Sequence, residues 1–312
     1  MSKLTSENIT TLTPVQYLVT YISGKMSLLA EIVKIRITVM VSLTTALGYF
    51  IGVNKITFDF IFPVVGILLL ACSSAALNQY QEKNSDALMD RTRNRPIPSG
   101  KIKSLNVLLI TIVLLILGSL ILILKTNLTA LLIGLLTFYW YNGVYTPLKK
   151  KFSLAIIPGS LVGALPPLAG WAATGENIFD IKILYIALYF FVWQIPHFWL
   201  LLLVHGKDFA KGGFPVLTDR MSRKSIAVIT FSMLIVTVLI SAMIPVLNIL
   251  NFNVTYILLL CFSVFMIYIA FGFLKSDLSR NETMKAFIGI NIFTLCFITL
   301  LVFDKFIFLM FK

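Results

Sequence analysis

Long apolar stretches alternate with short polar ones along nearly the whole chain. Nine stretches are long enough to cross a membrane, at about 37–53, 59–81, 104–124, 127–144, 154–173, 181–203, 225–249, 253–274 and 285–310. A helix of about 20 apolar residues spans the hydrocarbon core of a bilayer, which is about 30 Å thick. The pattern predicts an all-α integral membrane protein of nine transmembrane helices, with a polar tail at 1–25 and one membrane domain at 26–312.

Composition and charge agree with this interpretation. Charged residues make up 12% of the chain, against about 25% in ordinary soluble proteins. With a cytoplasmic N-terminus and nine crossings, 21 of the 26 lysine and arginine residues lie inside; the five outside are Lys55, Lys125, Lys182, Lys305 and Lys312. Cytoplasmic loops of membrane proteins carry such an excess. The distribution favours nine spans with the N-terminus inside and the C-terminus outside, and it accounts for the net charge of +13 without nucleic acid.

An acidic motif lies at the inner end of the second predicted helix. Asn78, Glu82, Asp86 and Asp90 recur every four residues, which places neighbouring members on one helix face. Mg²⁺ takes one or two carboxylates and completes its shell with phosphate oxygens and water. We therefore expect a Mg²⁺ site at Asn78, Glu82 and Asp86, with Asp90 as a further catalytic acid.

Basic residues follow directly after the acids. Arg91, Arg95 and Lys101 are candidate phosphate contacts. A guanidinium group binds two phosphate oxygens at once, and a lysine ammonium group attracts phosphate as a point charge. A proline-rich turn at 96–100 is expected to fold this basic arm back over the acidic helix. Together the two motifs predict a diphosphate site; the alternative is a solvated loop held by ion pairs.

A second polar segment, 205–224, follows the sixth predicted helix on the same side of the membrane. Asp208 is a candidate second metal ligand, and Lys207 and Lys211 are candidate diphosphate contacts. Alone this loop is weak evidence, but two charged loops facing each other form a plausible site.

Polar and aromatic residues near the inner ends of two helices are candidates for an acceptor pocket. They are Tyr141, Asn142, Tyr145, Trp193, Gln194 and His197. Polar groups in a span usually face the bundle interior, so His197 is open to three roles: a structural hydrogen bonder, a proton carrier or a haem-facing group. The lysine run at 149–151 is interpreted as attracted to anionic lipid, and the pair Pro166–Pro167 is expected to break the fifth helix.

These motifs resemble those of a known family. The segments are NQYQEKNSD (78–86), DALMDRTRNRPIPSG (86–100), YTPLKKK (145–151), GALPPLAGW (163–171), WQIPHFW (193–199) and KDFAKGGFPVL (207–217). They are similar to those of the UbiA-type intramembrane aromatic prenyltransferases, and most closely to the protohaem IX farnesyltransferase family. Two positions depart from the pattern: Glu82 replaces an aspartate, and Lys207–Asp208 replaces an acidic pair, which leaves one well-supported metal site.

The resemblance implies nine helices around a central cavity and a specific reaction. Farnesyl diphosphate and haem B are the implied substrates, haem O the product and Mg²⁺ the cofactor. The implied setting is a bacterial inner membrane, with haem A synthase as the partner expected from the family's pathway. Three alternatives stay open. They are a family member with a hydroxybenzoate or naphthoate acceptor, a transporter of an anionic substrate, and a non-catalytic assembly factor.

Overall fold

The computed structural model describes residues 14–275 and 279–311, and every regular element in that part of the chain is helical. The long helices are α2 (Pro14–Ile32), α3 (Ile35–Gly52), α4 (Ile61–Leu88), α5 (Ser104–Lys125), α6 (Leu128–Tyr139), α9 (Leu161–Ala172), α10 (Ile181–Lys211), α11 (Arg223–Ala242), α12 (Asn253–Lys275) and α13 (Arg280–Met310). The short ones are α7 (Thr146–Leu148), α8 (Ile156–Gly159), a π-helical turn at Trp140–Tyr145, and single turns at Phe58–Phe60, Leu217–Asp219 and Ile244–Leu247. The all-α prediction is confirmed.

Eight helical segments of the described chain are long and apolar enough to cross a membrane. They correspond to eight of the nine predicted spans. The remaining one, predicted at 154–173, is a shorter apolar segment, Ile156–Ala172, made of α8 and α9. The protein is therefore a multi-pass membrane protein, while the ninth crossing and the sides of the two termini remain predictions.

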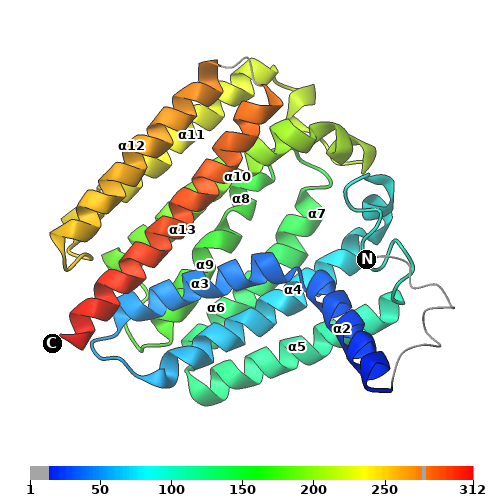
Figure 1. The fold of residues 1–312 in the computed structure, drawn as a ribbon, viewed down its shortest axis with the longest axis horizontal. Coiled ribbons are helices and arrows are strands. Elements are labelled where there is room, and N and C mark those ends of the chain that lie inside the picture. Colours follow the sequence, from blue (N-terminus) through cyan, green and yellow to red (C-terminus); the bar gives the residue numbers. More distant parts are fainter. Residues whose placement is uncertain (1–13, 276–278, 312) are drawn as a thin grey trace.

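The helices close into a ring (Figure 1). Helices neighbouring in sequence pack on one another, and α13 packs against α3, which joins the last helix to the first of the bundle. Apolar side chains fill a large core among α10, α11, α12 and α13 and a smaller one among α4, α5, α6 and α9, and a third, small cluster joins α2 to α4 and α5. Many large apolar residues stay exposed along the outer faces, for example Leu109, Ile112 and Ile116 of α5, as expected of surfaces in contact with lipid.

The expected break at Pro166–Pro167 is wrong. Both prolines lie inside α9, and the chain is interrupted earlier, at Ser160 between α8 and α9. Spanning helices tolerate proline where a neighbouring helix packs closely on the backbone. Here α3 does so, because a Cβ atom added to Gly48 would lie 1.8 Å from the carbonyl oxygen of Pro167.

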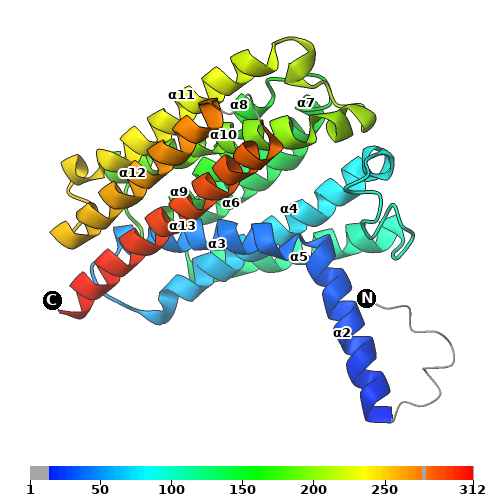
Figure 2. The same ribbon diagram turned by 45° about the horizontal axis from the view of Figure 1, so that its top comes forward.

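Part of the predicted polar tail is helical. Residues 14–25 belong to α2, which projects away from the ring (Figure 2), while residues 1–13 lie outside the described residues. The end of α2 is tied to α4, since the amide nitrogen of Gln79 donates hydrogen bonds to the carbonyl oxygens of Glu31 and Ile32 at 2.8 and 2.9 Å. This contact places the start of α3 beside the acidic motif.

Candidate active site

The acidic motif lies on a part of α4 that extends beyond the predicted span. The span was expected to end near residue 81, but the helix continues to Leu88. Asn78, Glu82 and Asp86 consequently occupy successive turns of one face, with only 1%, 5% and 0% of their surfaces exposed. Two carboxylates buried to this degree are costly unless cations or hydrogen-bond donors lie against them.

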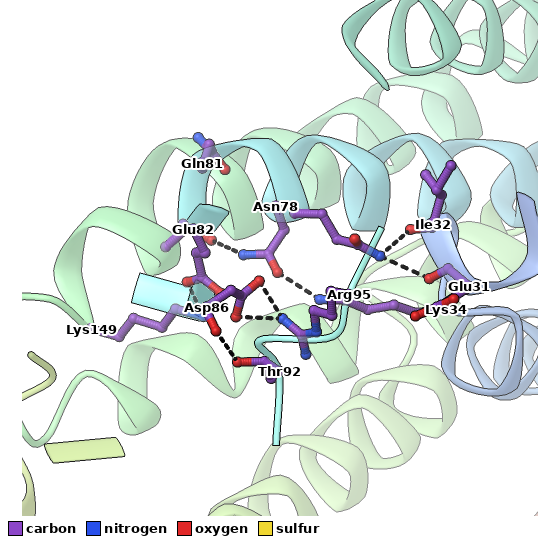
Figure 3. Close-up of polar contacts among 12 residues, drawn as sticks. Glu31, Ile32, Lys34, Asn78, Gln81, Glu82, Asp86, Thr92, Arg95 and Lys149 are labelled. Carbon is purple, nitrogen blue, oxygen red and sulfur yellow. Dashed lines mark hydrogen bonds and ion pairs between the residues drawn. The ribbon is translucent and has the colours of Figure 1, made fainter. Parts of the chain in front are cut away.

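Asp86 is paired with the basic loop that follows it (Figure 3). The Nη1 atom of Arg95 donates to both carboxylate oxygens of Asp86 at 2.7 Å, and the hydroxyl of Thr92 donates to the Asp86 carbonyl oxygen at 2.9 Å. The turn at 96–100, where Gly100 has a φ of 73°, returns the chain toward α4. The prediction that this loop folds back over the acidic helix is confirmed.

The other two motif residues are held by lysines that the sequence analysis missed (Figure 3). Lys34 Nζ donates to Asn78 Oδ1 at 2.6 Å, and Lys149 Nζ lies 2.6 Å from Glu82 Oε1. Burial, together with the charge of nearby Arg95, lowers the pKa of Lys34 to about 7. Each motif residue thus contacts a basic side chain from a different part of the chain.

The two lysines reach the motif from different backbone settings. Lys34 joins α2 to α3 with a φ of 52°, in the left-handed region, which non-glycine residues rarely adopt. In the run 149–151, Lys149 pairs with Glu82, whereas Lys150 donates to the carbonyl oxygen of Gln81 at 3.0 Å. Composition alone gives no signal that separates Lys149 from its neighbours.

A π-helical turn, Trp140–Tyr145, supports the motif from the side; such turns often occur at functional sites. Inside it, Asn142 accepts a hydrogen bond from the Ser74 hydroxyl at 2.6 Å and donates to Gln81 Oε1 at 3.1 Å. Asn142 therefore fixes the turn to α4, while Tyr141 and Tyr145 line a cavity beside the motif.

That cavity has a volume of about 220 Å³, and we call it the motif cavity. Its polar lining comprises Asn78, Glu82, Asp86, Lys34, Arg91, Arg95, Lys149, Tyr141, Tyr145 and Ser153. Its wall is aromatic and aliphatic, with Phe152, Phe198, Phe209, Phe214 and Leu201 among the residues. Four cations face two carboxylates, so the cavity attracts an anion.

The charged residues of the second loop contact the first loop rather than the motif cavity, although Phe209 and Phe214 of the same loop line that cavity. The carboxylate of Asp208 accepts hydrogen bonds from the backbone N–H groups of Asp90 at 2.7 Å and Arg91 at 3.3 Å. Lys211 pairs with the Asp90 carboxylate, and this contact lowers the pKa of Asp90. Lys207, Asp208 and Lys211 line a second cavity, so the structure brings the two loops together but separates Asp208 from Asn78, Glu82 and Asp86.

Several other predicted site residues lie away from the motif cavity. Lys101 is 3.7 Å from the Glu31 carboxylate and holds the loop to α2. Trp193 donates to the carbonyl oxygen of Ile290 at 3.3 Å. The oxygen of Gln194 lies where a Cβ at position 163 would be, and the ring of His197 is packed by aromatic residues, including Trp193 at 4.9 Å. These three α10 residues line neither of the two cavities.

The donor set of the motif suits magnesium. Among the described residues, no three His, Cys, Asp or Glu side chains are grouped to hold a metal ion by themselves. The amide oxygen of Asn78 and the carboxylates of Glu82 and Asp86 are hard oxygen ligands, and Mg²⁺ needs only one or two carboxylates when phosphate oxygens complete its shell. These residues therefore fit a metal that arrives together with a diphosphate.

Comparisons with known proteins identify the family. The model of the UbiA prenyltransferase family matches residues 39–296. The chain is 32% identical over 283 residues to a protoheme IX farnesyltransferase of Christiangramia forsetii, covering 89% of this chain and 93% of that one. It is 37% identical over 171 residues to a protoheme IX farnesyltransferase of Nitratidesulfovibrio vulgaris. That match covers 55% of this chain and 60% of the relative's length.

Solved structures agree on the fold. A structure from a study of digeranylgeranylglyceryl phosphate synthase superposes on this chain with a TM-score of 0.72 at 18% identity. The superposition covers 90% of this chain and 99% of that one. A UbiA homologue from Archaeoglobus fulgidus bound to GPP and Mg²⁺ gives a TM-score of 0.65 at 15% identity, with coverages of 88% and 99%. The match to residues 39–296 and the ring of apolar helices lead to one assignment: the chain belongs to the UbiA prenyltransferase family.

Proposed function

We propose that this prenyltransferase moves a farnesyl group from farnesyl diphosphate to a vinyl group of haem B, giving haem O. The observation that carries the proposal is the motif cavity. In it, buried Asn78, Glu82 and Asp86 lie beside Lys34, Arg95 and Lys149 and an aromatic wall. The acceptor is taken from the relatives named protoheme IX farnesyltransferase, and the setting we propose is a bacterial inner membrane with haem A synthase as a possible partner.

The cations of the cavity stabilise the leaving diphosphate. As the bond between the allylic carbon and the diphosphate oxygen breaks, negative charge grows on the leaving group, and fixed cations facing it lower the barrier. Arg91 and Arg95 line the cavity from the loop after α4, and Lys149 lines it from the segment after α7, so they can meet the diphosphate from two parts of the chain. Of the predicted diphosphate contacts, Lys101 and Lys211 take an outer role, holding the loops that carry these groups, and Lys207 lines the second cavity.

The aromatic wall protects the allylic cation. Tyr141 and Tyr145 have ring centroids 5.9 Å apart, and Phe198 lies 6.2 Å from Tyr145. Aromatic faces attract cations, and an apolar site delays attack by water. The vinyl group of the acceptor then forms the new carbon–carbon bond, and water adds to the cation left on the acceptor and releases a proton.

Magnesium is part of the proposal. When bound at Asn78, Glu82 and Asp86, Mg²⁺ would supply Lewis-acid assistance to the leaving group. The cations now on these residues can turn from the motif to the phosphate oxygens, since each is attached through a long flexible side chain. In this proposal Asp90 and Asp208 act on the loop geometry rather than on the metal, which leaves one metal site.

The decisive experiment supplies the purified protein with Mg²⁺, farnesyl diphosphate and haem B and measures the mass of the haem. We expect a haem heavier by one farnesyl group and one hydroxyl group. Prenylation of hydroxybenzoate in place of haem would overturn the acceptor, and turnover of neither acceptor would favour a transporter or an assembly factor.

A matched pair of variants tests the role of the motif. We expect Asp86→Asn to abolish turnover, because it removes a carboxylate from the metal site and from Arg95. The control is Asp219→Asn, which changes an exposed aspartate that lines neither cavity. Full activity of Asp86→Asn would exclude the proposed metal site.

A further inference from the structure

A second cavity opens beside the motif cavity, at the same end of the bundle. Its volume is about 720 Å³, and it lies among the last turns of α10, the first residues of α11 and α13, and the loop after α4. Its basic lining consists of Arg91, His205, Lys207, Lys211, Arg223 and Arg280. Leu202, Leu203 and Val204 of α10 give it an apolar wall.

The acids of this second cavity are already engaged. Asp90 is paired with Lys211, and Asp208 accepts hydrogen bonds from two backbone N–H groups. Arg223 donates only a long hydrogen bond, 3.4 Å, to the carbonyl oxygen of Leu203, and within the described residues neither it nor Lys207 forms an ion pair with a carboxylate. The cavity therefore presents uncompensated positive charge to a ligand.

Size and position indicate what kind of anion fits. Pockets for organic ligands usually measure about 300–1,000 Å³; the second cavity falls in this range, and the motif cavity, at about 220 Å³, does not. Arg91 and Leu202 line both cavities. A ligand in the second cavity can therefore extend past Arg91 and Leu202 toward the motif cavity, while Arg223 and Arg280, which line only the second cavity, contact another part of it.

We propose that the second cavity binds the acceptor by its carboxylates, with the two propionate groups of the porphyrin at Arg223 and Arg280 and the apolar macrocycle against Leu202 and Leu203. The inference rests on the proposed function, because it takes haem as the acceptor. On a porphyrin of the haem B type the vinyl groups lie on the side away from the propionates. Holding the carboxylates at the outer arginines thus directs a vinyl group toward the motif cavity.

The test compares haem B with its dimethyl ester, which has the same macrocycle without the carboxylate charges. Absorbance titrations of the full-length protein in phosphatidylcholine nanodiscs measure both dissociation constants. We expect wild-type protein to bind the diacid about tenfold more tightly, the size expected for two partly exposed ion pairs. The preference should disappear in Arg223→Gln/Arg280→Gln, with the KM for farnesyl diphosphate unchanged. Lys224→Gln, which removes a neighbouring charge that does not line the cavity, should retain it.

Each contrary outcome has a separate meaning. Equal affinity of the wild type for diacid and ester, or a preference that survives the double variant, overturns the inference and leaves the acceptor assignment intact. Absence of any haem binding by the wild type overturns both. Repeating the titrations with phosphatidylglycerol in the nanodiscs tests the other source of anions. If the double substitution changes only the response to this lipid, the cavity is a lipid site and the inference is wrong.

Discussion

The ion pair between Glu82 and Lys149 shows how one lysine of three acquires a specific role. The side chain of Glu82 is 6% exposed and that of Lys149 is 21% exposed. We expect Lys149→Gln to leave a buried carboxylate without its charged partner and to lower the free energy of unfolding by about 1–3 kcal/mol. Thermal unfolding in detergent measures this loss, and Lys151→Gln, an exposed neighbour, is the control.

A second substitution separates charge from packing. In Glu82→Gln/Lys149→Gln the buried charge is gone, so we expect part of the lost stability to return relative to Lys149→Gln alone. Turnover should not return, because Glu82 belongs to the proposed metal site. Equal unfolding temperatures for the Lys149 and Lys151 variants would contradict the assigned ion pair.

The contact between Asp90 and Lys211 predicts a pH dependence. Its hydrogen bond and charge lower the pKa of Asp90 below its ordinary value of 3.8. A carboxyl whose folded-state pKa is lowered stabilises the fold above its unfolded pKa, and this contribution is lost as the pH falls through the folded value. The ¹³C chemical shift of Asp90 should therefore titrate below 3.8 in the wild type and closer to 3.8 in Lys211→Ala. The same midpoint in both proteins would disprove the loop contact.

The packing of α3 on α9 depends on two glycines. A Cβ atom at Gly48 would lie 1.8 Å from the Pro167 carbonyl oxygen, and one at Gly170 would lie 1.9 Å from that of Thr45. Backbone atoms cannot yield as a flexible side chain can, so we expect Gly48→Ala and Gly170→Ala each to destabilise by about 1–3 kcal/mol or more. Gly24→Ala in α2, with nothing within 4 Å, should be neutral or slightly stabilising because alanine favours helix. Thermal unfolding of the three variants decides the matter, and equal stability would refute the close approach.

Local periodicity predicted much of α4 and little of what surrounds it. The spacing of Asn78, Glu82 and Asp86 is a property of one helix, so the sequence alone gave their common face. Lys34 reaches Asn78 because Lys34 itself adopts a left-handed backbone conformation between α2 and α3. The π-helical turn that orients Tyr141 and Tyr145 has no repeating sequence pattern that would predict it. Both arise from tertiary packing. Likewise, a carboxylate next to lysines can either bind a metal or hold a loop, and Asp208 was predicted from the sequence as a metal ligand. Only the fold shows that its carboxylate accepts hydrogen bonds from backbone N–H groups of the first loop.

The whole molecule concentrates its chemistry at one end of the helical ring. Both cavities, the acidic motif and the two charged loops lie there. The opposite loops carry fewer charges, and the one between α11 and α12, residues 243–252, has none. A transporter usually holds charge at mid-membrane between broken helices, whereas charge gathered at one end favours the proposed enzyme, in which the diphosphate binds at that end and the prenyl chain extends along the apolar helices.

This asymmetry leads to a prediction about topology. With nine crossings and the N-terminus inside, residue 99 in the loop before α5 lies inside and residue 176 in the loop after α9 lies outside. If the short segment of α8 and α9 does not cross, both residues lie on one side. We replace Cys72, Cys261 and Cys296 by serine and introduce Ser99→Cys or Glu176→Cys, both at exposed positions.

A membrane-impermeant maleimide applied to intact spheroplasts then distinguishes the arrangements. We expect labelling of the cysteine at 176 and none at 99 until the membrane is permeabilised, because 21 of the 26 basic residues lie inside in that orientation and such an excess marks the cytoplasmic side. The reverse pattern would show that the protein has the opposite orientation in the membrane. Labelling of neither position in intact spheroplasts would show that Ile156–Ala172 turns back without crossing. The two spans before it, Ser104–Lys125 and Leu128–Leu148, cross in opposite directions, so the short segment decides whether residues 99 and 176 lie on opposite sides.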